Sequence, residues 1–185
     1  MIRYLTILVL TLLVALGFFL TFAPTILDKG QNIVIEHQPY KISPQARALH
    51  SSLLVGDWHA DSLLWMRNLS EEYDYGHLDF PRMQKGNLGL QMFTTVTKSP
   101  SGQNYELNQT DASDNITLLA MTQRWPTATW SSLAERALFQ ADKLHHLASH
   151  DPDNLMLVRS RMELAEFLQR RQSNPTLIGG LLGTE

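Results

Sequence analysis

The sequence predicts an α/β domain with a parallel sheet, preceded by one transmembrane helix. Residues 4–23 are almost wholly apolar, and no charged side chain occurs between Arg3 and Asp28. Further along the chain, three apolar, strand-like runs are separated by stretches with helical patterning. Strand, crossover helix and strand in this order are typical of a parallel α/β domain.

The composition fits one packed domain with an appendage and limits the kinds of site. The chain has 185 residues, of which 44% are apolar, and its net charge is −3. No basic stripe stands out, so a nucleic-acid partner is not expected. The chain has no cysteine. Disulfides and thiolate metal sites are therefore excluded, and a bound metal would need His, Asp or Glu ligands.

The apolar N-terminal segment is predicted to be an uncleaved signal anchor. As a helix, residues 4–23 would span the roughly 30 Å hydrocarbon core of a bilayer. Residues 1–3 are then the cytoplasmic N-terminus, and the single basic side chain of Arg3 favours that orientation. The rest of the chain would lie outside the cytoplasm, in a bacterial periplasm or at the cell exterior.

A cleaved signal peptide is the alternative reading of the same segment, and it would give a secreted form. Thr21, Phe22 and Ala23 approach a cleavage signal, but Pro24 directly after them disfavours cleavage. Residues 24–50 are predicted to be a tether, because proline and glycine interrupt any long element there. The remaining residues, 51–185, form the predicted domain.

The elements of the domain follow in order along the chain. A buried strand is expected over 53–60, a short helix or ordered loop over 62–74, and a second strand over 87–97. Residues 99–113 are polar and rich in turn formers, which favours a loop. Helical patterning then runs over 114–150, with a break near Pro126. Its second part places one set of side chains on a common face: Leu133, Ala137, Ala141, Leu144 and Ala148.

The last part of the chain predicts a short extended piece, a helix and the third strand. Residues 155–160 form a short extended piece, and Ser160 with Glu163 makes a capping box for a helix over 161–171. Residues 176–183 are apolar and contain glycines, which indicates a strand buried on both faces.

A candidate metal site follows the first predicted strand. His59 and Asp61 are two residues apart, so a strand would point both side chains to the same face, where they could share one ion. Asp57 would lie on that face and orient a ligand. Alternatively, the pair is solvated and inert. A second group, His145, His146 and His150, lies near Asp151 at a predicted helix end, which favours a solvated helix C-terminus over a metal site.

Three segments in this order resemble the N-terminal part of the membrane dipeptidase family, the renal-type zinc dipeptidases. They are "GDWHADSLLW" (56–65), "GHLDFPRMQKGNLGLQMFT" (76–94) and "TLIGGLLGTE" (176–185). In that family a His-x-Asp pair ends the first barrel strand, and a D-x-P-R-x-x-x-G segment leads into the second. A glutamate that bridges two metal ions ends the third. The matching residues are His59 and Asp61; Asp79, Pro81, Arg82 and Gly86; and Glu185.

The resemblance implies the N-terminal half of a metal-dependent (β/α)₈ TIM-like barrel and a hydrolase that cleaves dipeptides with two zinc ions. His59 and Asp61 would bind one ion, and Glu185 would act as both a metal ligand and a catalytic residue. Such a barrel takes about 250 residues. The chain is therefore expected to be a fragment that is inactive by itself. Trp58 departs from the family, in which a small residue is common before the histidine.

Two other functions stay open at this point. One is a different amidohydrolase-like, metal-dependent barrel hydrolase, which would act on a non-peptide amide. The other is a non-catalytic, membrane-tethered remnant that binds a metal or a partner. The sequence does not indicate the preferred dipeptide, the metal used in the cell or the oligomeric state, for which a homodimer is one option.

Overall fold

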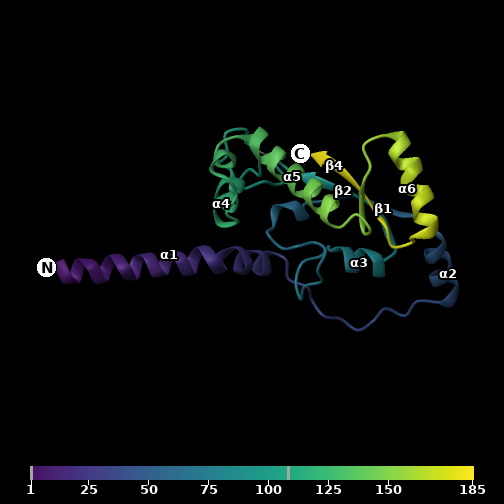
Figure 1. Cartoon of the computed structure of the whole chain (residues 1–185), viewed down its shortest axis with the longest axis horizontal. Coiled ribbons are helices and arrows are strands. Elements are labelled where there is room, and N and C mark those ends of the chain that lie inside the picture. The colour runs from purple at the N-terminus through teal and green to yellow at the C-terminus, as the bar shows by residue number, and fades with distance from the viewer. Residues whose placement is uncertain (1, 108) are drawn as a thin grey trace.

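The computed structural model describes residues 2–107 and 109–185. Met1, in the predicted cytoplasmic N-terminus, and Asn108, in the predicted loop 99–113, lie outside the described residues. A long helix, α1 (Ile2–Gln31), projects from a mixed α/β domain, and the N-terminal end of α1 lies far from that domain (Figure 1).

The domain confirms the predicted parallel sheet. Its four strands are β1 (Val55–Ala60), β2 (Leu88–Thr95), β3 (Leu155–Leu157) and β4 (Ile178–Thr184). All are parallel, in the spatial order β1-β2-β4-β3. The helices are α2 (Pro44–Ser52), α3 (Phe80–Lys85), α4 (Asn115–Thr122), α5 (Leu133–His150) and α6 (Arg161–Ser173), with 3₁₀ turns η1 (Ser62–Leu64) and η2 (Thr127–Trp130).

Helices α5 and α6 cover opposite faces of the sheet. Leu144 of α5 packs in one cluster with Phe93 of β2 and Ile178 of β4. Phe167 of α6 packs in another, against Leu90 of β2. Leu90 and Phe93 are three residues apart on one strand and therefore point to opposite faces.

The strand order explains this two-faced arrangement. The chain passes from β2 beyond the position of β4 to reach β3, and then returns to β4. Right-handed crossovers that run in opposite directions place their helices on opposite faces of a sheet. The described strands thus form an open sheet with helices on both sides, and the closed barrel stays a prediction.

The predicted break at Pro24 is wrong, because α1 continues through this proline to Gln31. Proline lacks the N–H that a helix interior needs. Contacts with the domain hold this end of the helix instead. The carbonyl of Pro24 accepts a hydrogen bond of 3.0 Å from Gln123. Asp28 is 1% exposed and lies 3.7 Å from the guanidinium of Arg67. The predicted tether is therefore helical at both ends, since α2 occupies its last part.

The composition and length of α1 meet the requirement for a membrane span. An 18-residue window of α1 has a mean hydropathy of 2.6, and none of that window is buried in the protein. Among the described residues, this is the one helix long and apolar enough to cross a membrane.

The predicted break near Pro126 is confirmed, since α4 and α5 are separate helices joined through η2. The predicted apolar face of α5 is only partly correct. Leu144 is buried, but Leu133 is 47% exposed. The side chains that α5 buries fully are Arg136, Gln140 and Leu144, four residues apart on one face. The two polar side chains occupy that face because they hydrogen-bond to the loop after β2 and to η2.

Two strand predictions need correction in detail. The extended piece predicted over 155–160 is a strand only as far as Leu157. Strand β4 is buried over Ile178–Gly180, but Leu182 is 43% exposed, so its second half is not covered on both faces.

Candidate metal centre

The three predicted metal ligands meet at one edge of the sheet. His59 lies at the end of β1, Asp61 follows that strand, and Glu185 follows β4. The carboxyl ends of parallel strands share an edge, which brings the two segments together across β2. The backbone of Glu185 is fixed there, because its N–H donates to Thr95 at 3.1 Å and its main-chain oxygen accepts from Thr97 at 3.1 Å.

The distances between these side chains suit ligands of one ion. The Nε2 atom of His59 lies 3.2 Å from Oδ1 of Asp61 and 3.3 Å from Oε2 of Glu185. One ligand atom from each of the three residues lies within 4.8 Å of the others. Ligands at about 2.0–2.1 Å from a tetrahedral zinc ion are about 3.3 Å apart.

The electrostatics of the cluster favour a cation. Two carboxylates converge on one imidazole, and the side chains of His59, Asp61 and Glu185 are 56%, 38% and 42% exposed. A metal ion can therefore reach the ligands from solvent. Within the described residues, this is the group of histidine and carboxylate side chains whose ligand atoms are close enough to share an ion.

Thr94 of β2 supports the cluster and was not predicted from the sequence. Its hydroxyl donates a hydrogen bond to Oδ1 of Asp61, and the residue is 5% exposed. Its place in the sequence could have indicated this role. Thr94 lies near the end of the middle strand, between the two strands next to the predicted ligands. A buried hydroxyl of this kind fixes the orientation of a carboxylate ligand.

The predicted position of Asp57 is wrong. The register between β1 and β2 shifts between Asp57, which pairs with Gln91, and Ala60, which pairs with Phe93. Three residues of β1 thus match two of β2, as in a β-bulge. Asp57 and Ala60 consequently share a face, opposite to that of His59 and Asp61. The carboxylate of Asp57 accepts from the backbone N–H of His59 at 3.1 Å, so it braces the bulge.

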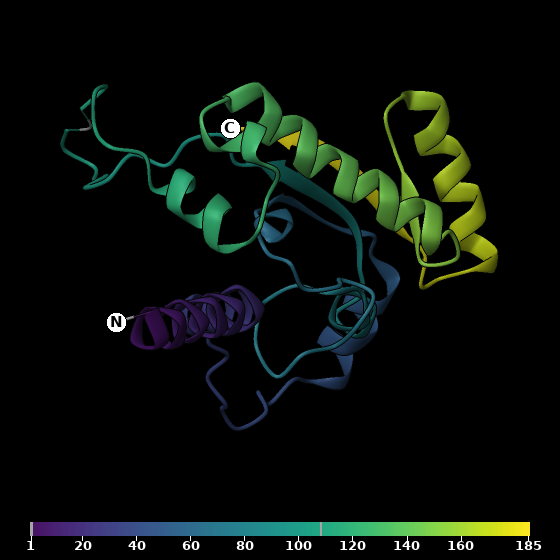
Figure 2. The same ribbon diagram turned by 60° about the vertical axis from the view of Figure 1, so that its left-hand side comes forward.

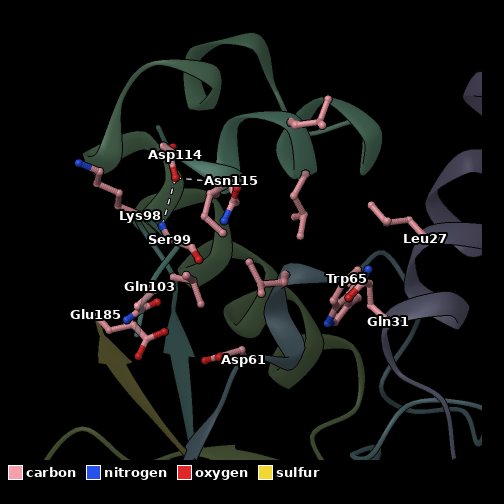
Figure 3. A pocket seen from close by; sticks show the side chains of 15 residues that line it. Leu27, Gln31, Asp61, Trp65, Lys98, Ser99, Gln103, Asp114, Asn115 and Glu185 are labelled. Carbon is pink, nitrogen blue, oxygen red and sulfur yellow. Dashed lines mark hydrogen bonds between the residues drawn. The ribbon is translucent and has the colours of Figure 1, made fainter. Parts of the chain in front are cut away.

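A cleft of about 860 Å³ opens beside the cluster, and both Asp61 and Glu185 line it (Figure 3). Its walls come from the end of α1, from α4 and from the loop after β2. Polar groups in the lining include Lys98, Gln103 and Asn115. Apolar side chains from α1, η1 and α4 line other parts of it.

One wall of the cleft is fixed by a buried ionic network. Arg136 of α5 pairs with Asp114, which caps the N-terminus of α4. The same guanidinium donates to the carbonyls of Thr97 and Thr129, each at 2.7 Å. Burial raises the pKa of Asp114, but hydrogen bonds from Arg136 and from two backbone amides outweigh it and hold the pKa below its usual range.

The second histidine group lies apart from this cleft. His146 and His150 are exposed at the end of α5, with ring centroids 3.8 Å apart. The imidazole of His150 contacts the carbonyl of His146 at 2.9 Å. These contacts agree with the interpretation of this group as a solvated helix end.

The segment around Asp79 has a structural role of its own. Asp79 is the N-cap of α3, and its carboxylate accepts from the N–H of Arg82 at 2.9 Å. Pro81 lies in the first turn of this helix, and Gly86 is its C-cap. The D-x-P-R-x-x-x-G pattern thus starts and ends a short helix before β2.

Comparison with models of known protein families and with curated proteins found no match.

Proposed function

We propose that the chain provides part of the active site of a zinc-dependent dipeptidase, in which His59, Asp61 and Glu185 bind zinc. The observation that carries this proposal is the convergence of all three side chains, from positions far apart in the sequence, at one edge of the sheet. The same three residues are those that match metal ligands in the resemblance to the membrane dipeptidase family.

The donor set fits zinc better than it fits the harder metals. One imidazole nitrogen and two carboxylate oxygens are ligands that zinc accepts, whereas magnesium and calcium sites are built mainly from oxygen. Three protein ligands also leave a fourth position open, as in catalytic zinc sites. The resemblance implies a second zinc ion, for which Glu185 would also be a ligand, and the remaining strands of a (β/α)₈ barrel.

The chain's own residues would position the ligands and the substrate. When bound, zinc supplies a Lewis acid and lowers the pKa of a water molecule. Thr94 holds Asp61 in place through its hydroxyl. The cleft is within the range of roughly 300–1,000 Å³ that is usual for small ligands. Lys98 and Asn115 in its lining offer polar groups to the charged ends of a dipeptide.

Residues 4–23 are proposed to anchor the protein in a membrane, with the domain on the extracytoplasmic side. The length, apolar composition and exposure of α1 support this. If the protein is anchored, alkaline extraction of membranes will leave it in the pellet with Ile2 still present. A soluble protein that starts at Pro24 would instead identify a cleaved signal.

The metal site is tested by zinc binding to the detergent-solubilised chain, measured by competition with a chromophoric chelator. His59→Ala removes a proposed ligand and should weaken zinc binding by at least about 100-fold. Changes to residues that only hydrogen-bond to a metal ligand typically cost about 10- to 100-fold. His145→Ala is the matched control, because this exposed histidine lies on α5. Equal binding by the His59→Ala variant and the unaltered protein would refute the site.

The reaction is tested on the protein as its gene encodes it, with dipeptides and N-acylated amino acids supplied separately. We expect the protein to hydrolyse dipeptides. A metal chelator should abolish this activity, and added zinc should restore it. Hydrolysis of the acylated amino acids alone would favour an amidohydrolase-like enzyme. Zinc binding with neither activity would favour a non-catalytic, membrane-tethered protein.

A further inference from the structure

Helix α4 presents apolar side chains that the domain does not cover. Leu118 is 68% exposed and Met121 is 38% exposed. With Thr122 they occupy one side of the helix, because residues three and four apart are neighbours on a helix surface. Ile116 and Ala120 on the opposite side of α4 are buried in the domain, so the exposed side is free to contact a membrane or a partner.

The position of α4 along α1 is fixed by a direct contact. Gln123, the C-cap of α4, donates its side-chain N–H to the carbonyl of Pro24. The part of α1 that precedes Pro24 is about 33 Å long at 1.5 Å per residue, close to the roughly 30 Å hydrocarbon core. The end of α4 therefore lies at the level where α1 would leave the bilayer.

The views of the molecule agree with this placement. In Figure 1, α4 is on the side of the domain that faces the N-terminal end of α1, and in Figure 2 the two helices lie close together. An apolar groove of about 440 Å³ joins them, lined by Phe18, Phe22 and Ile26 of α1 and by Thr122 of α4. The α1 side of this groove is mostly apolar, and Thr122, which meets it from α4, lies on the same side of that helix as Leu118 and Met121.

The junction between α1 and the domain holds this geometry. Asp28 is buried beside Arg67, and Lys29 forms an ion pair of 2.7 Å with Asp74. These contacts follow the proposed span directly, so the domain does not hang from a flexible segment. A membrane that contains residues 4–23 would bring its surface against α4.

We propose that the exposed side of α4, formed by Leu118, Met121 and Thr122, is a second membrane contact that inserts at the boundary between headgroups and acyl chains. The occupant is a phospholipid bilayer surface, and the groove between α1 and α4 takes acyl-chain segments. This inference rests on the proposed insertion of α1. Leu118 also lines the cleft beside the metal centre, so the cleft would open close to the membrane surface.

The absence of cysteine makes a direct test possible. Single variants Leu118→Cys, Leu138→Cys and Leu13→Cys of the full chain are spin-labelled and reconstituted into vesicles of phosphatidylcholine and phosphatidylglycerol. The accessibility of each label to oxygen and to a water-soluble nickel chelate then reports its depth. Leu138 is the matched control, since it is 58% exposed on α5. Leu13 reports whether α1 is inserted.

We expect labels at residues 13 and 118 to favour oxygen over the nickel chelate, and the label at 138 to favour the chelate. The ratio at residue 118 should exceed that at 138 by at least threefold. If residue 13 lies in the bilayer but 118 matches 138, the α4 contact is refuted and the anchor stands. If residue 13 is in water, both the anchor and the α4 contact are refuted.

Discussion

Replacement of Arg136 by methionine is predicted to destabilise the domain strongly. The Arg136 side chain is 1% exposed. It pairs with Asp114 and donates to the carbonyls of Thr97, Thr129 and Trp130. Methionine retains much of the apolar stem but leaves the Asp114 carboxylate and these carbonyls without their donor. Removal of one partner from a buried ion pair costs about 3–5 kcal/mol.

The control is the exposed ion pair at the start of α6. Arg159 is 67% exposed and pairs with Glu163 within the reach of one helical turn. Exposed pairs contribute about 0–1 kcal/mol, so Arg159→Met should have little effect. The two variants remove the same functional group, and they differ mainly in burial and in the number of hydrogen bonds lost.

Urea denaturation of the protein in mild detergent, followed by tryptophan fluorescence, measures the difference. With a slope of about 1–3 kcal/mol per molar urea, Arg136→Met should lower the midpoint by at least about 1 M. A double-mutant cycle with Asp114→Ala should give a coupling energy above about 1 kcal/mol. Equal midpoints for Arg136→Met and Arg159→Met would show that the network does not form as described.

Three further predictions concern pH, the metal and packing. Burial lowers the pKa of Lys143 to about 8, whereas that of an unfolded lysine is about 10.4. Between these values the unfolded chain binds more protons, so stability should rise with pH by up to about 3 kcal/mol, and Lys143→Met should abolish the rise in denaturation curves. Thr94→Val removes the donor to Asp61 and should weaken zinc binding roughly tenfold in chelator competition. Phe167→Ala, at a fully buried site, should cost about 3–5 kcal/mol in urea, while Leu168→Ala, at 42% exposure, should cost far less.

Local patterns predicted the parts of the fold that depend on local chemistry. The capping box is one example, because the side chain of Ser160 accepts from the N–H of Glu163 where α6 begins. The parallel sheet followed from the alternation of strand-like and helical runs. His59 and Asp61 were proposed as ligands from their spacing on one strand, whereas Glu185 was proposed only from the family resemblance.

Tertiary contacts determined the features that were missed. Helix α1 continues through Pro24 to Gln31, and Gln123, far along the chain, bonds to the Pro24 carbonyl, a contact that local sequence does not reveal. The buried side of α5 includes Arg136 and Gln140, whose polar atoms bond to segments before the helix, so hydrophobic periodicity identified only part of the buried face, through Leu144. The face of Asp57 depends on a bulge that strand alternation does not reveal.

The burial of Pro24 also bears on the biogenesis of the protein. Ala23, where a signal peptidase would cut, is partly buried, and the next residue is buried against the domain. Signal peptidases bind their substrates as extended chain, whereas the bond between Ala23 and Pro24 lies in a helix that is partly covered by the domain. If a signal peptidase cuts at that bond, the cut would have to precede the docking of α1 on the domain.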